Sequence, residues 1–194
     1  MGRCELGNAR VYVTTRKRCA EGNRMGQWLD LDNHAGKKEL LDSFGNLYKD
    51  ETSPEVCFLD WQDIPDRFIS ETDISQNLFD LLSGFRQLNP TDKIGFSIWL
   101  GRHQKTIPDT DAKTILQAFR LCYQGYFGFK QQFTEYYAKE ELGITKEGSP
   151  RFDFITFNKY LFEDLFIIDS GFVFRKVKYE LKSDNKNGQR TDKA

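Results

Sequence analysis

The chain has 194 residues and a formal net charge of −1, with 39% hydrophobic and 14% aromatic residues. This length suits one or two ordinary domains, or three small ones, and 17 phenylalanines are available for a core. No apolar stretch reaches the roughly 20 residues of a membrane-spanning helix, and the N-terminus lacks the apolar segment of a secretory signal, so we expect a cytoplasmic protein that does not enter a membrane.

The first part of the chain alternates strands with a helix. Residues 9–15 and 27–32 are rich in strand-forming side chains, and the polar residues 16–26 between them predict a loop joining a hairpin. Residues 36–50 place apolar side chains at helical spacing, and residues 55–61 form an apolar run that predicts a third strand. We therefore expect a compact α/β unit here.

The middle of the chain has the pattern of a small helical unit. Residues 72–88 carry apolar side chains at helical spacing, with Thr72 as a candidate N-cap. Residues 92–101 repeat the pattern after the helix-breaking pair Asn89-Pro90. Two short helices are predicted.

The last third returns to a mixture of helices and strands. Helices are predicted over residues 109–126, 129–143 and 154–165, with Gly143 at a helix C-cap position. Residues 167–181 contain a Ser-Gly turn between two apolar runs, which predicts a terminal hairpin.

The fold class predicted from these patterns is α+β, an elongated chain of three small domains in the order α/β, helical, α/β. The expected parts are an N-terminal domain over 9–70, a helical domain over 71–106, a C-terminal domain over 107–180 and a disordered tail over 181–194.

The near-zero net charge conceals an uneven distribution. Residues 25–82 hold thirteen acidic and four basic side chains, a net charge of −9, whereas the segments on both sides are net positive. Arg16, Lys17 and Arg18 make the first loop basic. The acidic third of the chain must face partners that tolerate a strongly negative field.

The stretch EVCFLDWQDIPD at residues 55–66 concentrates the acidic residues after a predicted buried strand. Asp60, Asp63 and Asp66 allow four readings: a general acid/base group, a metal site, a solvated acidic edge, or carboxylates that imitate phosphates. No histidine or lysine is close enough in sequence to complete a hydrolytic set, and the four cysteines show no metal-binding spacing. The sequence therefore predicts no catalytic residue, no metal site and no cofactor.

Two N-terminal stretches resemble the ArdA-type antirestriction proteins. The first is GNRMGQWLDLD, whose matching residues are Gly26, Trp28, Leu29 and Asp30. The second is EVCFLDWQDIP, whose matching residues are Asp60, Trp61, Asp63 and Pro65.

Two C-terminal stretches continue the resemblance in the same order. FTEYYAKEELG at 133–143 is similar to a helix of the family's third domain. In FDFITFNKYLFEDLFIIDSGFVFR at 152–175, the best matches are Phe152, Asp153, Phe157, Leu161, Gly171 and Phe174. The resemblance covers roughly residues 9–177.

The resemblance implies a non-enzymatic protein, often encoded on mobile genetic elements. It implies an elongated homodimer whose acidic surface mimics B-DNA and competitively occupies the DNA-binding groove of type I restriction–modification enzymes. The carboxylates expected to imitate phosphates are distributed over the acidic segment: Asp30, Asp32, Asp42, Asp50, Glu51, Glu55, Asp60, Asp63, Asp66, Glu71, Asp73 and Asp80.

Two other functions remain open on the sequence. One is an ArdA-like interaction protein with weakened mimicry that binds another DNA-binding or regulatory protein. The other is weak nucleic-acid binding through the basic first loop and the basic tail, although no direct nucleic-acid binding is expected under the leading hypothesis.

Overall fold

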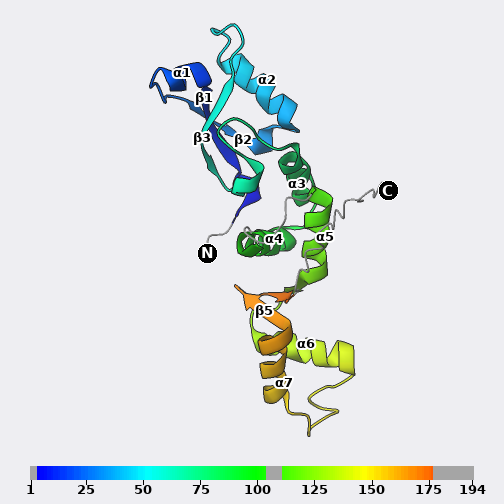
Figure 1. Cartoon of the computed structure of the whole chain (residues 1–194). Helices are drawn as coiled ribbons and strands as arrows, with labels where there is room; N and C mark the ends of the chain where they lie inside the picture. The colour runs from blue at the N-terminus through cyan, green and yellow to red at the C-terminus, as the bar shows by residue number, and fades with distance from the viewer. Residues whose placement is uncertain (1–3, 104–110, 177–194) are drawn as a thin grey trace, which may run out of the picture.

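A computed structural model describes residues 4–103 and 111–176 of the chain. Its helices and small antiparallel sheets make the protein an α+β fold, as predicted. Figure 1 shows an elongated molecule in which one sheet with α1 and α2 lies at one end, α3, α4 and α5 lie in the middle, and α6 and α7 lie at the other end. No helix within the described residues is long and apolar enough to cross a membrane.

The first sheet contains three antiparallel strands in the order β2-β1-β3. Their bounds are Arg10–Thr15 for β1, Gln27–Asp30 for β2 and Val56–Gln62 for β3. The predicted hairpin of the first two strands is confirmed, and β1 takes the central position because it also pairs with β3.

The segment between β1 and β2 is more ordered than the predicted loop. It begins with a short helix, α1 (Arg16–Ala20), because the side chain of Thr15 accepts a hydrogen bond from the backbone N–H of Arg18. The N-terminal 3-10 turn Leu6–Asn8 and a second one at Leu31–Asn33 flank the sheet.

Helix α2 (Lys37–Leu47) confirms the helix predicted over residues 36–50. It contributes Leu40 and Phe44 to the core that also contains Val11 and Phe58 from the sheet. The chain after α2 is held by the Tyr48 hydroxyl, which donates a buried hydrogen bond of 3.0 Å to the Val13 carbonyl. Burying an apolar side chain such as that of Leu40 or Phe44 stabilises the folded state by about 1.5–3 kcal/mol relative to leaving it exposed.

The middle of the molecule is helical, as predicted. Its helices are α3 (Gln76–Arg86), α4 (Pro90–His103) and, after residues 104–110, α5 (Ala112–Cys122). The N-cap of α3 is Ser75 and not the predicted Thr72, because the Ser75 hydroxyl accepts from the N–H of Asn77. The predicted break at Asn89-Pro90 is confirmed, because it falls between α3 and α4. Pro90 is the first residue of α4, a position where the missing N–H of proline costs nothing.

The predicted helix over residues 109–126 is wrong at its C-terminal end. The helix stops at Cys122, and Tyr123–Tyr126 form β4, which pairs with β6 (Phe172–Arg175). The second sheet has the order β4-β6-β5, with β5 at Phe166–Asp169. Pairing with a strand about 50 positions away overrides the local helical spacing, and Gly125 supplies a φ of 121° that few other residues adopt.

The predicted Ser-Gly turn connects β5 with β6 and confirms the terminal hairpin. Ser170 and Gly171 have φ values of 52° and 85°, the left-handed pair that suits a tight antiparallel turn. A Cβ atom on Gly171 would lie 2.5 Å from the Tyr126 ring and 3.0 Å from the Gly128 Cα. The family-like glycine is therefore required both for backbone conformation and for space.

Helix α6 (Lys130–Leu142) ends at Gly143, whose φ of 66° confirms the predicted C-cap. Helix α7 (Phe154–Tyr160) continues as a π-helical turn over Leu161–Leu165. These elements enclose a small core of Phe133, Leu161, Phe166 and Val173.

A much larger hydrophobic core runs through the rest of the molecule. It includes Cys4 and Val11 near the N-terminus, Leu78 and Trp99 in the helical region, and Phe174 in β6. The division into three domains stays a prediction. The predicted tail lies outside the described residues, as does the predicted boundary between residues 106 and 107.

Candidate functional site

The twelve predicted carboxylates lie between the end of β2 and the middle of α3. Ten of their residues are exposed, while Glu51 and Asp63 are half-buried. Their ion pairs divide them into two groups. The paired carboxylates, each within 4 Å of a described lysine or arginine, are Asp32, Asp50, Glu51, Glu55 and Asp73.

Helix α1, at the start of the predicted basic loop, contacts part of this acidic segment. The Arg18 guanidinium donates to Asp50 at 2.8 Å and to Glu51 at 3.1 Å, and it lies 4.7 Å from the centre of the Tyr48 ring. Glu51, with a side chain only 14% exposed, also accepts from the Thr15 hydroxyl. Arg16 pairs with Glu55 at 3.2 Å. Two arginines therefore offset most of the charge of these three carboxylates, and the cluster keeps a net charge of −1.

The other two ion pairs fasten the sheet region to helix α3. Arg86 on α3 donates to the Asp32 carboxylate at 2.9 Å and to the carbonyls of Leu31 and Asp32 at 3.2 Å. Lys37 at the start of α2 pairs with Asp73, just before α3. The main role of Asp32 and Asp73 is therefore structural, because each helps to connect the sheet region with the region of α3.

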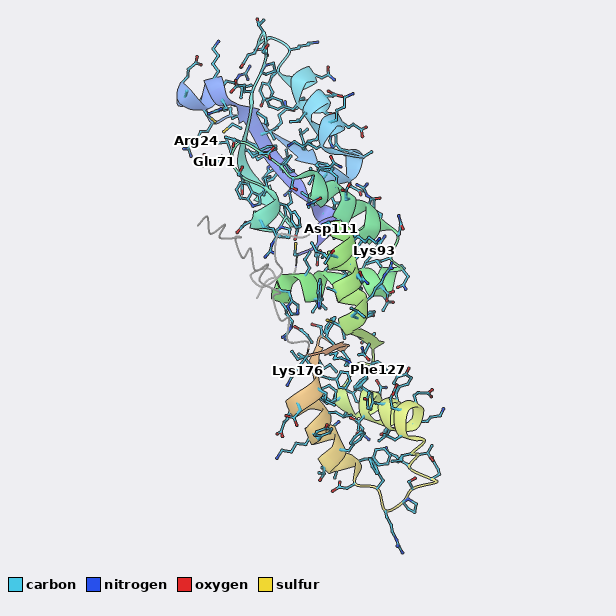
Figure 2. The ribbon with its side chains drawn as sticks, turned by 45° about the vertical axis from the view of Figure 1, so that its right-hand side comes forward. Arg24, Glu71, Lys93, Asp111, Phe127 and Lys176 are labelled. Atoms are coloured by element: carbon cyan, nitrogen blue, oxygen red, sulfur yellow. The ribbon has the colours of Figure 1, made fainter. Side chains whose placement is uncertain are left out.

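The remaining seven, which we call the unpaired carboxylates, take part in no ion pair between described residues. They are Asp30, Asp42, Asp60, Asp63, Asp66, Glu71 and Asp80. Figure 2 labels Glu71 beside the N-terminal part of the molecule, away from Asp111 and Lys93 in the helical region.

Three of the unpaired carboxylates shape the turn that follows β3. Asp60 accepts from the backbone N–H of Trp61 at 2.8 Å, and Asp66 accepts from the Trp61 indole N–H at 3.1 Å. Asp63 accepts from the backbone N–H of Glu5 at 2.9 Å. Asp63 also has a φ of 57°, a left-handed conformation that aspartate tolerates better than most residues. Asp60 and Asp66 therefore hold Trp61 in place, and Asp63 ties the turn to the N-terminal segment.

Asp30 and Asp60 flank an aromatic and basic strip on the outer face of the first sheet. Strand pairing places Arg10 beside Asp30, and Tyr12 between Trp28 and Asp60. The Arg10 guanidinium lies 4.6 Å from the Trp28 ring centre and donates to Gln62 at 2.9 Å.

Trp28 lies at the surface of the first sheet and not in the core. It is 36% exposed because Trp28 and Tyr12 share the outer face, with their ring centres 5.3 Å apart. Trp61, by contrast, is partly buried and packs against the large core.

The surface near these residues contains two open hollows. One, of about 580 Å³, is polar and is lined by residues that include Asp30, Asp32, Asp63 and Arg10. The other, of about 650 Å³, lies beside the Arg86–Asp32 joint and includes Phe85 in its lining. No group of three or more potential ligands among the described residues is arranged to hold a metal ion.

The sequence predicted no functional carboxylates outside residues 25–82, because the segments on both sides of that range are net positive. Glu141, Glu147 and Asp164 are in no ion pair between described residues and are further candidates for a charged surface. Asp111 and Asp153 instead cap helices α5 and α7, and hydrogen bonds from Thr114 and Thr156 lower the pKa of the two carboxyl groups. An aspartate directly before a run of residues with helical spacing signals such a cap in the sequence.

Comparison with known proteins matches the chain to a protein family. A family model described as antirestriction protein (ArdA) matches residues 11–176, which is most of the chain. No curated protein matches.

Proposed function

This chain belongs to the ArdA antirestriction protein family, and from that premise we propose that it inhibits type I restriction–modification enzymes by occupying their DNA-binding groove with surface carboxylates. Such a groove is built from lysines and arginines that neutralise phosphates, and duplex DNA carries about one charge per 1.7 Å of axis. A carboxylate surface offers similar charge without bases, so inhibition is independent of DNA sequence. The inhibitor needs no catalytic residue, cofactor or metal.

The observation that carries the proposal is the separation of the acidic segment into paired and unpaired carboxylates. Two basic residues of α1 are engaged by carboxylates: Arg16 by Glu55, and Arg18 by Asp50 and Glu51. Their positive charge is therefore largely cancelled next to the carboxylates that they contact. The seven unpaired carboxylates retain their charge for a partner, which supports mimicry in a chain whose net charge is only −1.

The turn after β3 supports the proposal through its rigidity. One oxygen each of Asp60, Asp63 and Asp66 accepts a hydrogen bond within the protein. A carboxylate has a second oxygen and further lone pairs, so each can still accept from a lysine or arginine of a partner. A side chain that is already held loses less entropy on binding.

We propose a homodimer as the active form, located in the cytoplasm with its target. Two copies would lengthen the charged surface along a chain that is already elongated (Figure 1). The family resemblance, rather than a contact in the structure, supports this part of the proposal.

A restriction assay in cells that carry a type I system tests the proposal. The wild-type chain should raise the plating efficiency of unmodified phage. A variant in which all seven unpaired carboxylates are changed to their amides should lose that protection. The matched control is the double variant Arg16→Gln/Glu55→Gln, which removes an ion pair without changing net charge and should protect fully. If the sevenfold variant is expressed and folded like the wild type and protects phage equally well, DNA mimicry by these carboxylates is contradicted.

The weakened-mimic and nucleic-acid-binding alternatives make different predictions. Arg16 and Arg18, which would contact nucleic acid in the second alternative, are both engaged with carboxylates. We propose that the protein does not retard duplex DNA in a gel at low salt. Retardation that disappears with rising salt would favour nucleic-acid binding, and a salt-resistant complex with a different protein would favour the weakened mimic.

A further inference from the structure

We propose that Cys19 and Cys57 are a redox-active thiol pair that closes an intramolecular disulfide when the protein reacts with a peroxide. The two sulfur atoms lie 3.2 Å apart, although the residues are 38 positions apart in the sequence. Cys19 belongs to α1, and Cys57 belongs to β3. A disulfide requires the sulfurs to approach to about 2.05 Å, a movement of roughly 1 Å.

The surroundings of the two thiols differ in a way that assigns the order of reaction. Cys57 is buried, whereas Cys19 is half-buried on the short helix and is the more accessible of the two. Burial, together with the neighbouring Cys19 thiol, raises the pKa of Cys57 to about 11. Cys57 therefore stays protonated near neutral pH, and since the thiolate is the nucleophile, oxidation begins at Cys19.

The chemistry balances with one molecule of hydrogen peroxide. The Cys19 thiolate attacks one peroxide oxygen, the O–O bond breaks, and the products are a Cys19 sulfenic acid and hydroxide. The Cys57 sulfur then attacks the Cys19 sulfur and gives up its proton, while the sulfenic oxygen leaves as water. The hydroxide takes up the proton that Cys19 lost when it ionised. Two thiols are thus oxidised to one disulfide, and the peroxide is reduced to two waters. A thiol reductant reverses the result by exchange.

The cross-link would fix α1 against the sheet. α1 carries Arg16, which pairs with Glu55, and Arg18, which pairs with Asp50 and Glu51. Closing the loop from 19 to 57 would restrain these arginines and the segment that leads to β2. Oxidation should therefore stabilise the charge arrangement of the N-terminal end.

The other two cysteines provide internal controls in the same chain. Both Cys4 and Cys122 are buried, and the Cys4 thiol donates to the carbonyl of Asp63. Cys122 is the last residue of α5. Neither is placed at the Cys19–Cys57 contact.

Peptide mapping of the full-length protein tests the proposal. Reduced protein is treated with stoichiometric hydrogen peroxide, and the remaining thiols are blocked with N-ethylmaleimide. The expected product joins the Cys19 and Cys57 peptides, leaves Cys4 and Cys122 alkylated after denaturation, and returns to four thiols with dithiothreitol. In Cys57→Ser, a sulfenic-acid trap such as dimedone should label Cys19; in Cys19→Ser, Cys57 should oxidise many-fold more slowly than Cys19 does.

Hydrogen exchange and thermal unfolding supply a second readout. The oxidised wild type should show slower exchange over α1 and a higher Tm than the reduced form, and Cys19→Ser should show neither change. Intermolecular disulfides, oxidation spread over all four cysteines, or no intramolecular cross-link would each overturn the proposal. None of these results depends on antirestriction activity.

Discussion

The Arg86 guanidinium donates to the Asp32 carboxylate at 2.9 Å, so a carboxylate of the acidic segment connects helix α3 with the 3-10 turn that follows β2. The same guanidinium also bonds the carbonyls of Leu31 and Asp32. A planar guanidinium can make these bonds together, whereas a lysine ammonium cannot reproduce the fork.

Arg86→Lys should therefore lower the free energy of unfolding by roughly 1–2 kcal/mol, more than the loss of an ordinary surface ion pair. Urea denaturation measures the change. Arg16→Lys is the matched control, because the Arg16–Glu55 pair is highly exposed on both sides and should contribute little. Equal losses of unfolding free energy in the two variants would contradict this structural role of Arg86.

The hydrogen bond from the Trp61 indole to Asp66 allows the structural role of this carboxylate to be tested separately from its charge. Asp66→Ala removes the acceptor for the indole N–H and should cost about 1 kcal/mol of stability. Asp66→Asn keeps an acceptor oxygen and should unfold close to wild type while removing one negative charge. Thermal and urea unfolding of both variants, with Trp61→Phe as a reference for the lost bond, check this. A large destabilisation by Asp66→Asn would show that the charge itself holds the turn.

Two glycines with positive φ values should respond differently to alanine. Gly171→Ala puts a Cβ against the Tyr126 ring and the Gly128 backbone, and should cost at least about 2 kcal/mol. Gly143→Ala meets no atom within 4 Å and should cost only about 1 kcal/mol, from the left-handed backbone alone. Unfolding measurements on the two variants in parallel test the ranking, and a larger loss at Gly143 would contradict it.

Asp153 should make stability dependent on acid. Its oxygens accept from the N–H groups of Ile155 and Thr156 and from the Thr156 hydroxyl, and these bonds lower the carboxyl pKa from its ordinary value of 3.8. The stabilisation is complete above that ordinary value and is lost as pH falls through the lower folded-state pKa. Asp153→Asn should therefore show a smaller loss of stability between about pH 5 and pH 2 than wild type. Urea unfolding at a series of pH values measures this difference. Identical stability profiles for the wild type and Asp153→Asn would contradict a stabilising role for the ionised Asp153 carboxylate.

Inhibition of a purified type I enzyme should weaken as salt rises. The unpaired carboxylates are mostly exposed, and screening acts over about 10 Å at 0.1 M ionic strength. Single amide substitutions among the seven should each weaken inhibition only slightly, and combined substitutions should act cumulatively. A DNA-cleavage assay across a salt series measures both effects. Abolition by one substitution would contradict a distributed surface.

The order of most elements could be predicted from the sequence because they depend on local patterns. The helix over α2 follows from apolar spacing, and the Gly143 C-cap and the Ser170-Gly171 turn follow from residues that favour left-handed backbone. The strand β4 could not be predicted, because pairing with β6 overrides the helical spacing of its own residues. The exposure of Trp28 depends on which face of the sheet receives α2, a choice that the strand sequence does not reveal.

The sequence by itself determined that one third of the chain is strongly acidic and that the motifs are ArdA-like, since both are properties of residue order. Only the tertiary structure decided which carboxylates lie beside a basic side chain that offsets their charge. Arg16, Arg18, Lys37 and Arg86 reach their acidic partners over 32 to 54 positions of sequence. The Arg16 and Arg18 contacts need α1 to lie beside the segment that leads into β3, and the Lys37 and Arg86 contacts need the α3 region to pack beside the first sheet. Coulomb attraction depends on distance in space, so charge counted along the chain cannot show where that charge is cancelled.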